Sequence, residues 1–153
     1  MYLVVRNFLS IIIVFMFMSF QTGDPLLCDA KELKEKAEDL LDPYKYDSSE
    51  LTNIIYKENQ TIKEVEMPLF IGEKYKIVFL TEALPKALEI QIYNKSIGSK
   101  NRKLLFSYKS AGQDKKNIDF EISKSRHMYI DYVIPPAEEG SFIGCVVFAV
   151  GYK

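Results

Sequence analysis

The chain has 153 residues, with 20 Lys and Arg against 21 Asp and Glu, so its formal net charge is −1. This balance excludes a broadly basic protein of the kind that binds nucleic acid through phosphate contacts. The hydrophobic fraction of 48% is sufficient for one core in a chain of this length.

The N-terminal segment has the pattern of a secretory signal peptide. Arg6 precedes an apolar stretch from Phe8 to Phe20, and the polar, helix-breaking stretch 21–25 follows. Signal peptides have this order of parts, whereas a membrane-spanning helix needs roughly 20 apolar residues. We predict that residues 1–23 are removed, that the protein is periplasmic or secreted, and that it meets the membrane only during export. A retained N-terminal anchor is the alternative.

One amphipathic helix is expected after the signal segment. Asp29 and Glu32 have the spacing of a capping box, and Asp42-Pro43 ends the helix. The polar face carries both signs of charge, which favours packing on the same domain over binding to a membrane surface. The opposite face collects the apolar side chains Leu33, Ala37, Leu40 and Leu41.

The rest of the chain changes to a period of two, which is typical of strands. The alternation is cleanest in 117–123, where Ile118, Phe120 and Ile122 are predicted to point inward. The last segment is apolar on both faces, as a strand covered on both sides would be. The predicted strands are 53–57, 61–70, 72–80, 87–94, 103–109, 117–123, 127–134 and 142–150.

About eight short strands separated by turns indicate a mainly β fold. We predict an antiparallel β-sandwich that is jelly-roll-like, with one N-terminal amphipathic helix docked on it. The predicted units are the signal peptide 1–23, a helix and linker in 24–50, and the β-sandwich domain 51–153. The locally basic stretch Lys95–Lys103 is interpreted as a solvated loop, with a phosphate-binding patch as the alternative.

The chain has two cysteines, Cys28 and Cys145, which lie near its two ends. Two lone cysteines tend to pair in an oxidising compartment, so we predict a disulfide that ties the helix to the last strand. Two reduced, unrelated thiols are one alternative. The other is a catalytic thiol with His127, the single histidine, as its base.

Other catalytic and metal-binding patterns are missing from the sequence. There is no nucleophile elbow, Walker loop or dinucleotide fingerprint, and one histidine is too few for a typical zinc site. The oxygen-rich stretches 41–50 and 135–141 leave calcium open, although neither has the spacing of a known calcium loop. We therefore expect a protein that is not an enzyme and uses no cofactor.

Tyrosines are abundant, and three of them are candidates to face a ligand. Tyr44, Tyr46 and Tyr93 lie in loop-like or outward positions, where aromatic rings could receive a sugar. We predict an exported, non-enzymatic protein with a binding or structural role in the periplasm or at the cell surface. Its partner would be an unknown envelope protein or a glycan. A small secreted hydrolase or a carbohydrate-binding module is the alternative.

Four stretches carry a resemblance to known proteins: "CDAKELKEKAEDLLDPYKYDSSELTNIIYK", "VEMPLFIGEKYKIVFLTEALPKALEIQIYNK", "IDFEIS" and "GCVVFAVGYK". Together they resemble small exported proteins of unassigned function of the Bacteroidetes type. The resemblance covers nearly all of the mature chain, including both cysteines. It implies a bacterial, periplasmic or secreted location, and it implies no activity and no functional residues. A looser likeness to β-sandwich modules of secreted bacterial peptidases concerns the fold alone.

Overall fold

The computed structural model describes residues 28–70, 72–110, 120–122, 127–138 and 140–153, with the backbone alone for 120–122. None of the helices in this part is both long and apolar enough to cross a membrane. The elements in chain order are α2 (Ala30–Asp39), β1 (Lys45–Tyr56), β2 (Thr61–Pro68), β3 (Tyr75–Leu80), β4 (Glu89–Tyr93), β5 (Leu104–Lys109), β6 (Phe120–Ile122), β7 (His127–Ile134) and β8 (Phe142–Tyr152).

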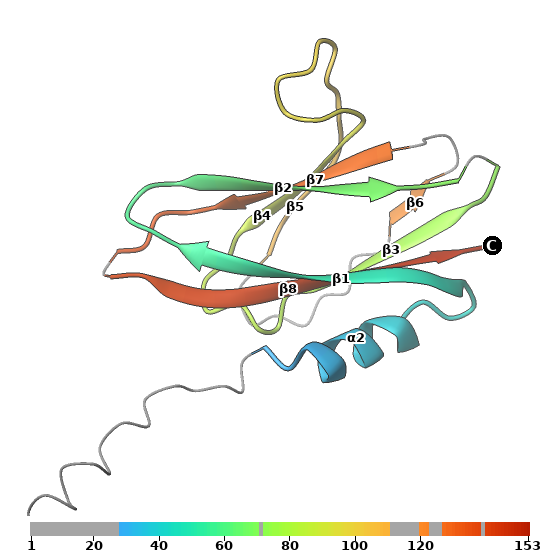
Figure 1. Cartoon of the computed structure of the whole chain (residues 1–153), viewed down its shortest axis with the longest axis horizontal. Coiled ribbons are helices and arrows are strands. Elements are labelled where there is room, and N and C mark those ends of the chain that lie inside the picture. The colour runs from blue at the N-terminus through green and yellow to red at the C-terminus, as the bar shows by residue number, and fades with distance from the viewer. Residues whose placement is uncertain (1–27, 71, 111–119, 123–126, 139) are drawn as a thin grey trace, which may run out of the picture.

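The strands form two four-stranded sheets that lie face to face (Figure 1). Sheet A has the order β1-β8-β3-β6, and sheet B has the order β2-β7-β4-β5. Every neighbouring pair is antiparallel. The pairs β1–β8, β2–β7, β3–β6 and β4–β5 are the successive rungs of one long hairpin, rolled so that alternate rungs fall in opposite sheets. This is the strand order of a jelly roll, and it confirms the predicted fold class.

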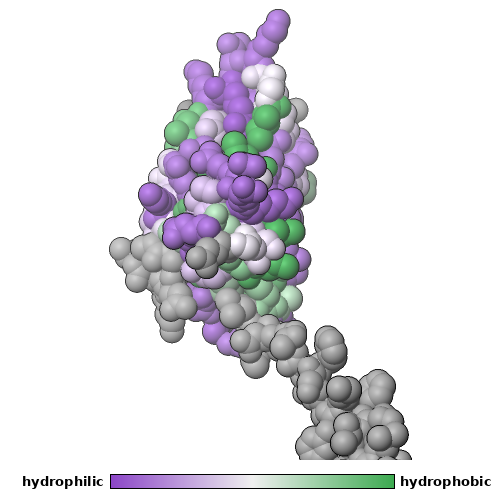
Figure 2. Space-filling model, turned by 90° about the vertical axis from the view of Figure 1, so that its left-hand side faces the viewer, coloured by the Kyte–Doolittle hydropathy of each residue, from purple (hydrophilic) through white to green (hydrophobic). Residues whose placement is uncertain are grey.

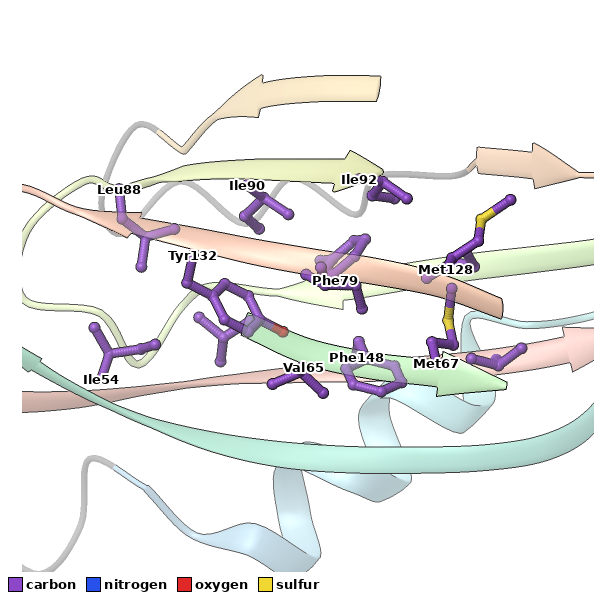
Figure 3. Close-up of a cluster of buried hydrophobic side chains, with 14 of the residues drawn as sticks. Ile54, Val65, Met67, Phe79, Leu88, Ile90, Ile92, Met128, Tyr132 and Phe148 are labelled. Carbon is purple, nitrogen blue, oxygen red and sulfur yellow. The ribbon is translucent and has the colours of Figure 1, made fainter. Parts of the chain in front are cut away.

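The main hydrophobic core fills the space between the two sheets (Figure 3). Apolar side chains from both sheets meet there, and the rings of Phe79 and Phe148 lie 6.3 Å apart between their centroids. Each large apolar side chain buried in this way stabilises the fold by about 1.5–3 kcal/mol. The predicted alternation is confirmed for the buried residues Tyr75, Ile77, Phe79, Leu88, Ile90, Ile92, Met128, Ile130, Tyr132 and Ile134.

The segment with the cleanest predicted alternation lies mostly outside the described residues. The backbone of β6 pairs with β3, with Phe120 opposite Ile77 and Ile122 opposite Tyr75. A strand at this place is therefore confirmed. The predicted inward direction of Ile118, Phe120 and Ile122 falls outside what the structure describes.

β8 is buried on both faces, as its continuous apolar sequence predicts. Val146, Phe148 and Val150 belong to the core between the sheets. Cys145, Val147 and Ala149 alternate with them and contact a second apolar cluster under α2. β8 therefore joins the core between the sheets to the layer formed by the helix.

α2 lies against the outer face of sheet A (Figure 1). Asp29 caps the helix as predicted, because its Oδ1 accepts hydrogen bonds from the backbone N–H groups of Lys31 and Glu32 at 3.0 and 3.1 Å. Leu33 and Ala37 are buried against the sheet. The predicted helix, its cap and its apolar face are confirmed.

The predicted linker needs a correction. β1 begins at Lys45, so its first residues fall within the segment 24–50, for which the sequence predicts only a helix and a linker. Six residues, from Lys45 to Glu50, are polar or aromatic and show no apolar alternation, although they pair with the end of β8. They lie in an edge strand, which tolerates polar side chains on both faces, so hydrophobic periodicity does not reveal them.

Gly144 lets β8 approach the loop that follows β3. A Cβ atom at this position would lie 2.5 Å from Pro85 Cδ and 2.8 Å from the carbonyl oxygen of Ala83.

We expect Gly144→Ala to lower the free energy of unfolding by roughly 1–3 kcal/mol through overpacking. Ser141→Ala, at an exposed neighbour, should stay within about 0.5 kcal/mol. Urea denaturation of both variants measures the free energy of unfolding. Equal losses in the two variants would contradict the close approach of β8 to the loop after β3.

Candidate ligand-binding face

The outer face of sheet B is a broad surface of the sandwich that no described helix covers (Figure 1). The strand register aligns one polar side chain from each of its four strands in a row. Glu64 on β2 lies opposite Asp131 on β7, Asp131 lies opposite Gln91 on β4, and Gln91 lies opposite Ser107 on β5. The inward neighbours of these residues fill the core. The row is therefore a continuous polar ladder across the face.

Arg102 holds one end of this ladder. Its Nη2 atom lies 3.0 Å from Glu64 Oε2 and 2.7 Å from Asp131 Oδ1. The guanidinium also stacks on the ring of Tyr93, with Cζ 3.5 Å from the ring centroid. The Asp131 side chain is only 2% exposed. A buried carboxylate needs such a partner, so Arg102 compensates two acidic side chains that the register places side by side.

Arg102 belongs to the segment 94–103, which joins β4 to β5 and rises above sheet B (Figure 1). The Nε of Arg102 donates to the carbonyl oxygen of Lys95 at 2.8 Å, and the N–H of Ile97 donates to Glu64 Oε2 at 2.7 Å. The side chain of Asn94 accepts from the N–H of Lys103 at 2.7 Å. These bonds attach the segment to the sheet in a defined conformation.

A chain of hydrogen bonds continues the ladder across β4 and β5. Tyr93 Oη donates to Gln91 Oε1 at 2.8 Å, and Gln91 Nε2 donates to Glu89 Oε1 at 2.8 Å. Ser107 Oγ donates to the same Glu89 oxygen at 2.6 Å. The hydrogen bonds from Ser107 and then Gln91 lower the pKa of Glu89. Glu89 therefore remains a charged acceptor whose neighbours are already oriented.

A second polar group lies at the other end of β7. His127 Nδ1 is 2.8 Å from Glu66 Oε1, and Tyr129 Oη donates to the same oxygen at 3.4 Å. Desolvation and then the Glu66 carboxylate raise the pKa of Tyr129. Within the described residues, no three His, Cys, Asp or Glu side chains gather in a way that could hold a metal ion. The face thus presents hydroxyl, amide and carboxylate groups beside tyrosine rings.

The predicted disulfide between Cys28 and Cys145 is present, with the two Cα atoms 6.0 Å apart. It joins the residue before the cap of α2 to the buried centre of β8. The alternative of a Cys145–His127 catalytic pair is wrong, because Cys145 is bonded to Cys28 in sheet A and His127 lies on β7 in sheet B. The two positions are separated by the sandwich core.

The structure does not bring the three candidate tyrosines together. Tyr44 directly precedes β1, and the Nζ of Lys153 is 4.9 Å from its ring centroid. Tyr46 lies in β1 of sheet A, with its Oη 3.0 Å from Ser49 Oγ. Tyr93 lies on sheet B, and Arg102 covers one face of its ring. A ligand-facing role for these tyrosines stays a prediction, and Tyr93 alone belongs to the candidate face.

Sequence reasoning missed the polar ladder itself. From the sequence, Glu64 is interpreted with Glu66 as part of a solvated face, and isolated Glu, Gln and Ser residues on other strands are usually interpreted in the same way. Asp131 offers the one signal, since it is the single acidic residue in the strand 127–134 and has apolar or aromatic residues on both sides. The side chains that make the ladder and its anchor are Glu64, Glu89, Gln91, Arg102, Ser107 and Asp131.

No protein-family model matches the chain, and no curated protein matches it. Among solved structures, it is similar to a chain described as "CBM4 structure and function", with 12% identity and a TM-score of 0.43 over 76% of this chain and 83% of that one. PirA is similar with 16% identity and a TM-score of 0.35, over 73% of this chain and 99% of that one.

The CBM36-1 domain of a multidomain xylanase from the hindgut metagenome of Trinervitermes trinervoides is also similar. It has 9% identity and a TM-score of 0.34, over 72% of this chain and 92% of that one. At these identities and TM-scores, the three likenesses carry no conclusion about function.

Proposed function

We propose that this chain is an exported, non-enzymatic binding protein of the bacterial periplasm or cell surface, and that it binds a glycan on the outer face of sheet B. One observation carries the proposal: the hydrogen-bonded chain from Tyr93 through Gln91 and Glu89 to Ser107. Sugars present closely spaced hydroxyl groups that both donate and accept hydrogen bonds. Amide, carboxylate and hydroxyl side chains held in fixed orientations suit such a ligand.

Export is supported by two independent features. Residues 1–23 have the order of parts of a signal peptide. The Cys28–Cys145 bond is of the kind that persists in oxidising compartments. The resemblance to small exported proteins of the Bacteroidetes type agrees with both features. We therefore propose that the mature protein acts outside the cytoplasm.

A glycan is favoured over an envelope protein by the composition of the face. Protein interfaces usually have a fully buried, apolar centre with few charged residues. The proposed binding surface on sheet B is instead formed by the polar side chains of Tyr93, Gln91, Glu89 and Ser107. A nucleic acid is disfavoured because the charged carboxylate of Glu89 in this surface would repel phosphates.

Gln91→Ala tests the proposal most simply. Gln91 lies in the middle of the hydrogen-bonded chain, so its loss should free Tyr93 and Glu89 and weaken glycan binding by about tenfold or more. The measurement is binding of labelled protein to an array of bacterial and plant polysaccharides, with affinities for the positive glycans determined by calorimetry.

Gln60→Ala is the matched control, because Gln60 is an exposed glutamine in the turn between β1 and β2. Its affinity should equal that of the unchanged protein. A thermal melt of both variants separates lost binding from lost folding. Equal loss in the two variants, or no bound glycan in the array, would contradict the proposal.

A further inference from the structure

The segment that joins β4 to β5, together with β5 itself, is positively charged. The stretch 94–110 contains no Asp or Glu, whereas the whole chain has a net charge of −1. Arg102 in this stretch is already paired with Glu64 and Asp131. Lys95, Lys100 and Lys103 are exposed lysines between β4 and β5, and the Nζ of Lys95 donates to the carbonyl oxygen of Lys100 at 2.9 Å.

Aliphatic side chains accompany these lysines. Ile97 and Leu104 are each 51% exposed, and Leu105 is 42% exposed. Figure 2 shows hydrophobic residues directly beside the hydrophilic ones at this projecting end. We call the combined surface the hairpin tip, and it is formed by Lys95, Ile97, Lys100, Lys103, Leu104 and Leu105.

The hairpin tip is held in one conformation before any partner arrives. Ser96 Oγ and Ser99 Oγ lie 3.0 Å apart, and the N–H of Ser99 donates to the carbonyl of Ser96 at 3.2 Å. Gly98 closes the turn with φ +82°, a conformation that other residues rarely adopt. A rigid tip loses little conformational entropy on binding.

We propose that the hairpin tip docks on an anionic lipid surface. Lysine ammonium groups would lie against lipid phosphates, while Ile97, Leu104 and Leu105 would enter the boundary between head groups and acyl chains. An acidic polysaccharide could use the lysines but offers nothing apolar to the aliphatic side chains. Ile97 lies in the projecting segment with the lysines, and Leu104 and Leu105 begin β5 where this segment returns to the sheet. Both residue kinds therefore occur together along 95–105, which favours lipid. This inference is independent of glycan binding by sheet B, and it replaces our expectation from the sequence that the protein meets the membrane only during export.

The chain contains no tryptophan, so a single indole can report on one chosen position. We expect the fluorescence of Ile97→Trp to shift to the blue with mixed phosphatidylcholine–phosphatidylglycerol vesicles, and to be quenched when the lipids are brominated. Vesicles of phosphatidylcholine alone should produce no shift. Ile143→Trp is the matched control, because Ile143 is 62% exposed on the opposite sheet and should not respond.

In the full chain, residues 1–23 could themselves bind vesicles. The indole signal remains informative there, because it reports only on the position that carries the tryptophan. Adding Lys95→Gln, Lys100→Gln and Lys103→Gln to Ile97→Trp should lower the affinity for anionic vesicles, measured by the blue shift, on the order of a hundredfold. The same number of changes at Lys45, Lys57 and Lys74 should leave it unaltered. The proposal is overturned by no response at position 97, by equal responses at 97 and 143, or by an equal response to neutral vesicles. It is also overturned if brominated lipids fail to quench the indole and a soluble acidic polysaccharide abolishes the blue shift.

Discussion

Arg102→Met is expected to lower the free energy of unfolding by about 3–5 kcal/mol. The change leaves the Asp131 carboxylate, which is 2% exposed, without the guanidinium that lies 2.7 Å away. It also leaves Glu64 directly opposite Asp131 with no cation between the two carboxylates. Chemical denaturation measures the loss. Amide exchange in the segment 94–103 should become faster, because Arg102 attaches this segment to the sheet.

Lys36→Met is the control for this prediction. Lys36 also contacts two carboxylates, Glu32 at 2.7 Å and Glu82 at 2.9 Å, but it is 47% exposed. Its loss should lower the free energy of unfolding far less than the loss of Arg102, because solvent screens an exposed ion pair. The double variant Arg102→Met with Asp131→Asn should recover part of the stability, because the unpaired charge is gone. Similar losses for Arg102→Met and Lys36→Met would show that burial does not strengthen the Arg102 pair.

Removal of the Cys28–Cys145 bond is expected to have an effect of similar size. The bond closes a loop of 117 residues, for which the chain-entropy model gives about 4–5 kcal/mol as an upper value. The double variant Cys28→Ser with Cys145→Ala should therefore melt roughly 5–15 °C lower while it keeps its strand spectrum. The jelly roll retains its core between the sheets, so α2 should be the first element to exchange its amide protons.

The control is the unchanged protein, which under denaturing conditions should show no free thiol before reduction and two after it. A double variant with the same melting temperature as the oxidised protein would contradict a stabilising role for the bond. So would loss of the strand spectrum, because the sandwich would then depend on the disulfide to fold.

The sequence predicted the fold well because most elements carry strong local signals. The cap at Asp29 and the spacing of Leu33 and Ala37 located α2. Period-two alternation located β3, β4 and β7, and the uninterrupted apolar run located β8. The start of β1 at Lys45 escaped detection, because hydrophobic periodicity is silent in an edge strand that is polar on both faces.

The candidate face could not be predicted in the same way. Glu64, Gln91 and Ser107 come from three strands that are distant in the sequence, and they meet Asp131 only through the register of sheet B. Arg102 reaches Glu64 and Asp131 across the sheet from the segment 94–103, at sequence separations of 38 and 29 residues. No local pattern encodes such a contact, so Arg102 looked like one more charge in a solvated loop.

Amide NMR titration of the isotope-labelled protein, with the saccharide that binds most tightly in the array, tests glycan binding by sheet B most directly. The largest shift changes should fall on Glu89, Gln91 and Ser107, whose side chains form the hydrogen-bonded chain on the outer face. The amides of α2, on the far side of the sandwich, should not move. Changes confined to α2 and β1, or no changes with any saccharide, would contradict a glycan-binding role for this face.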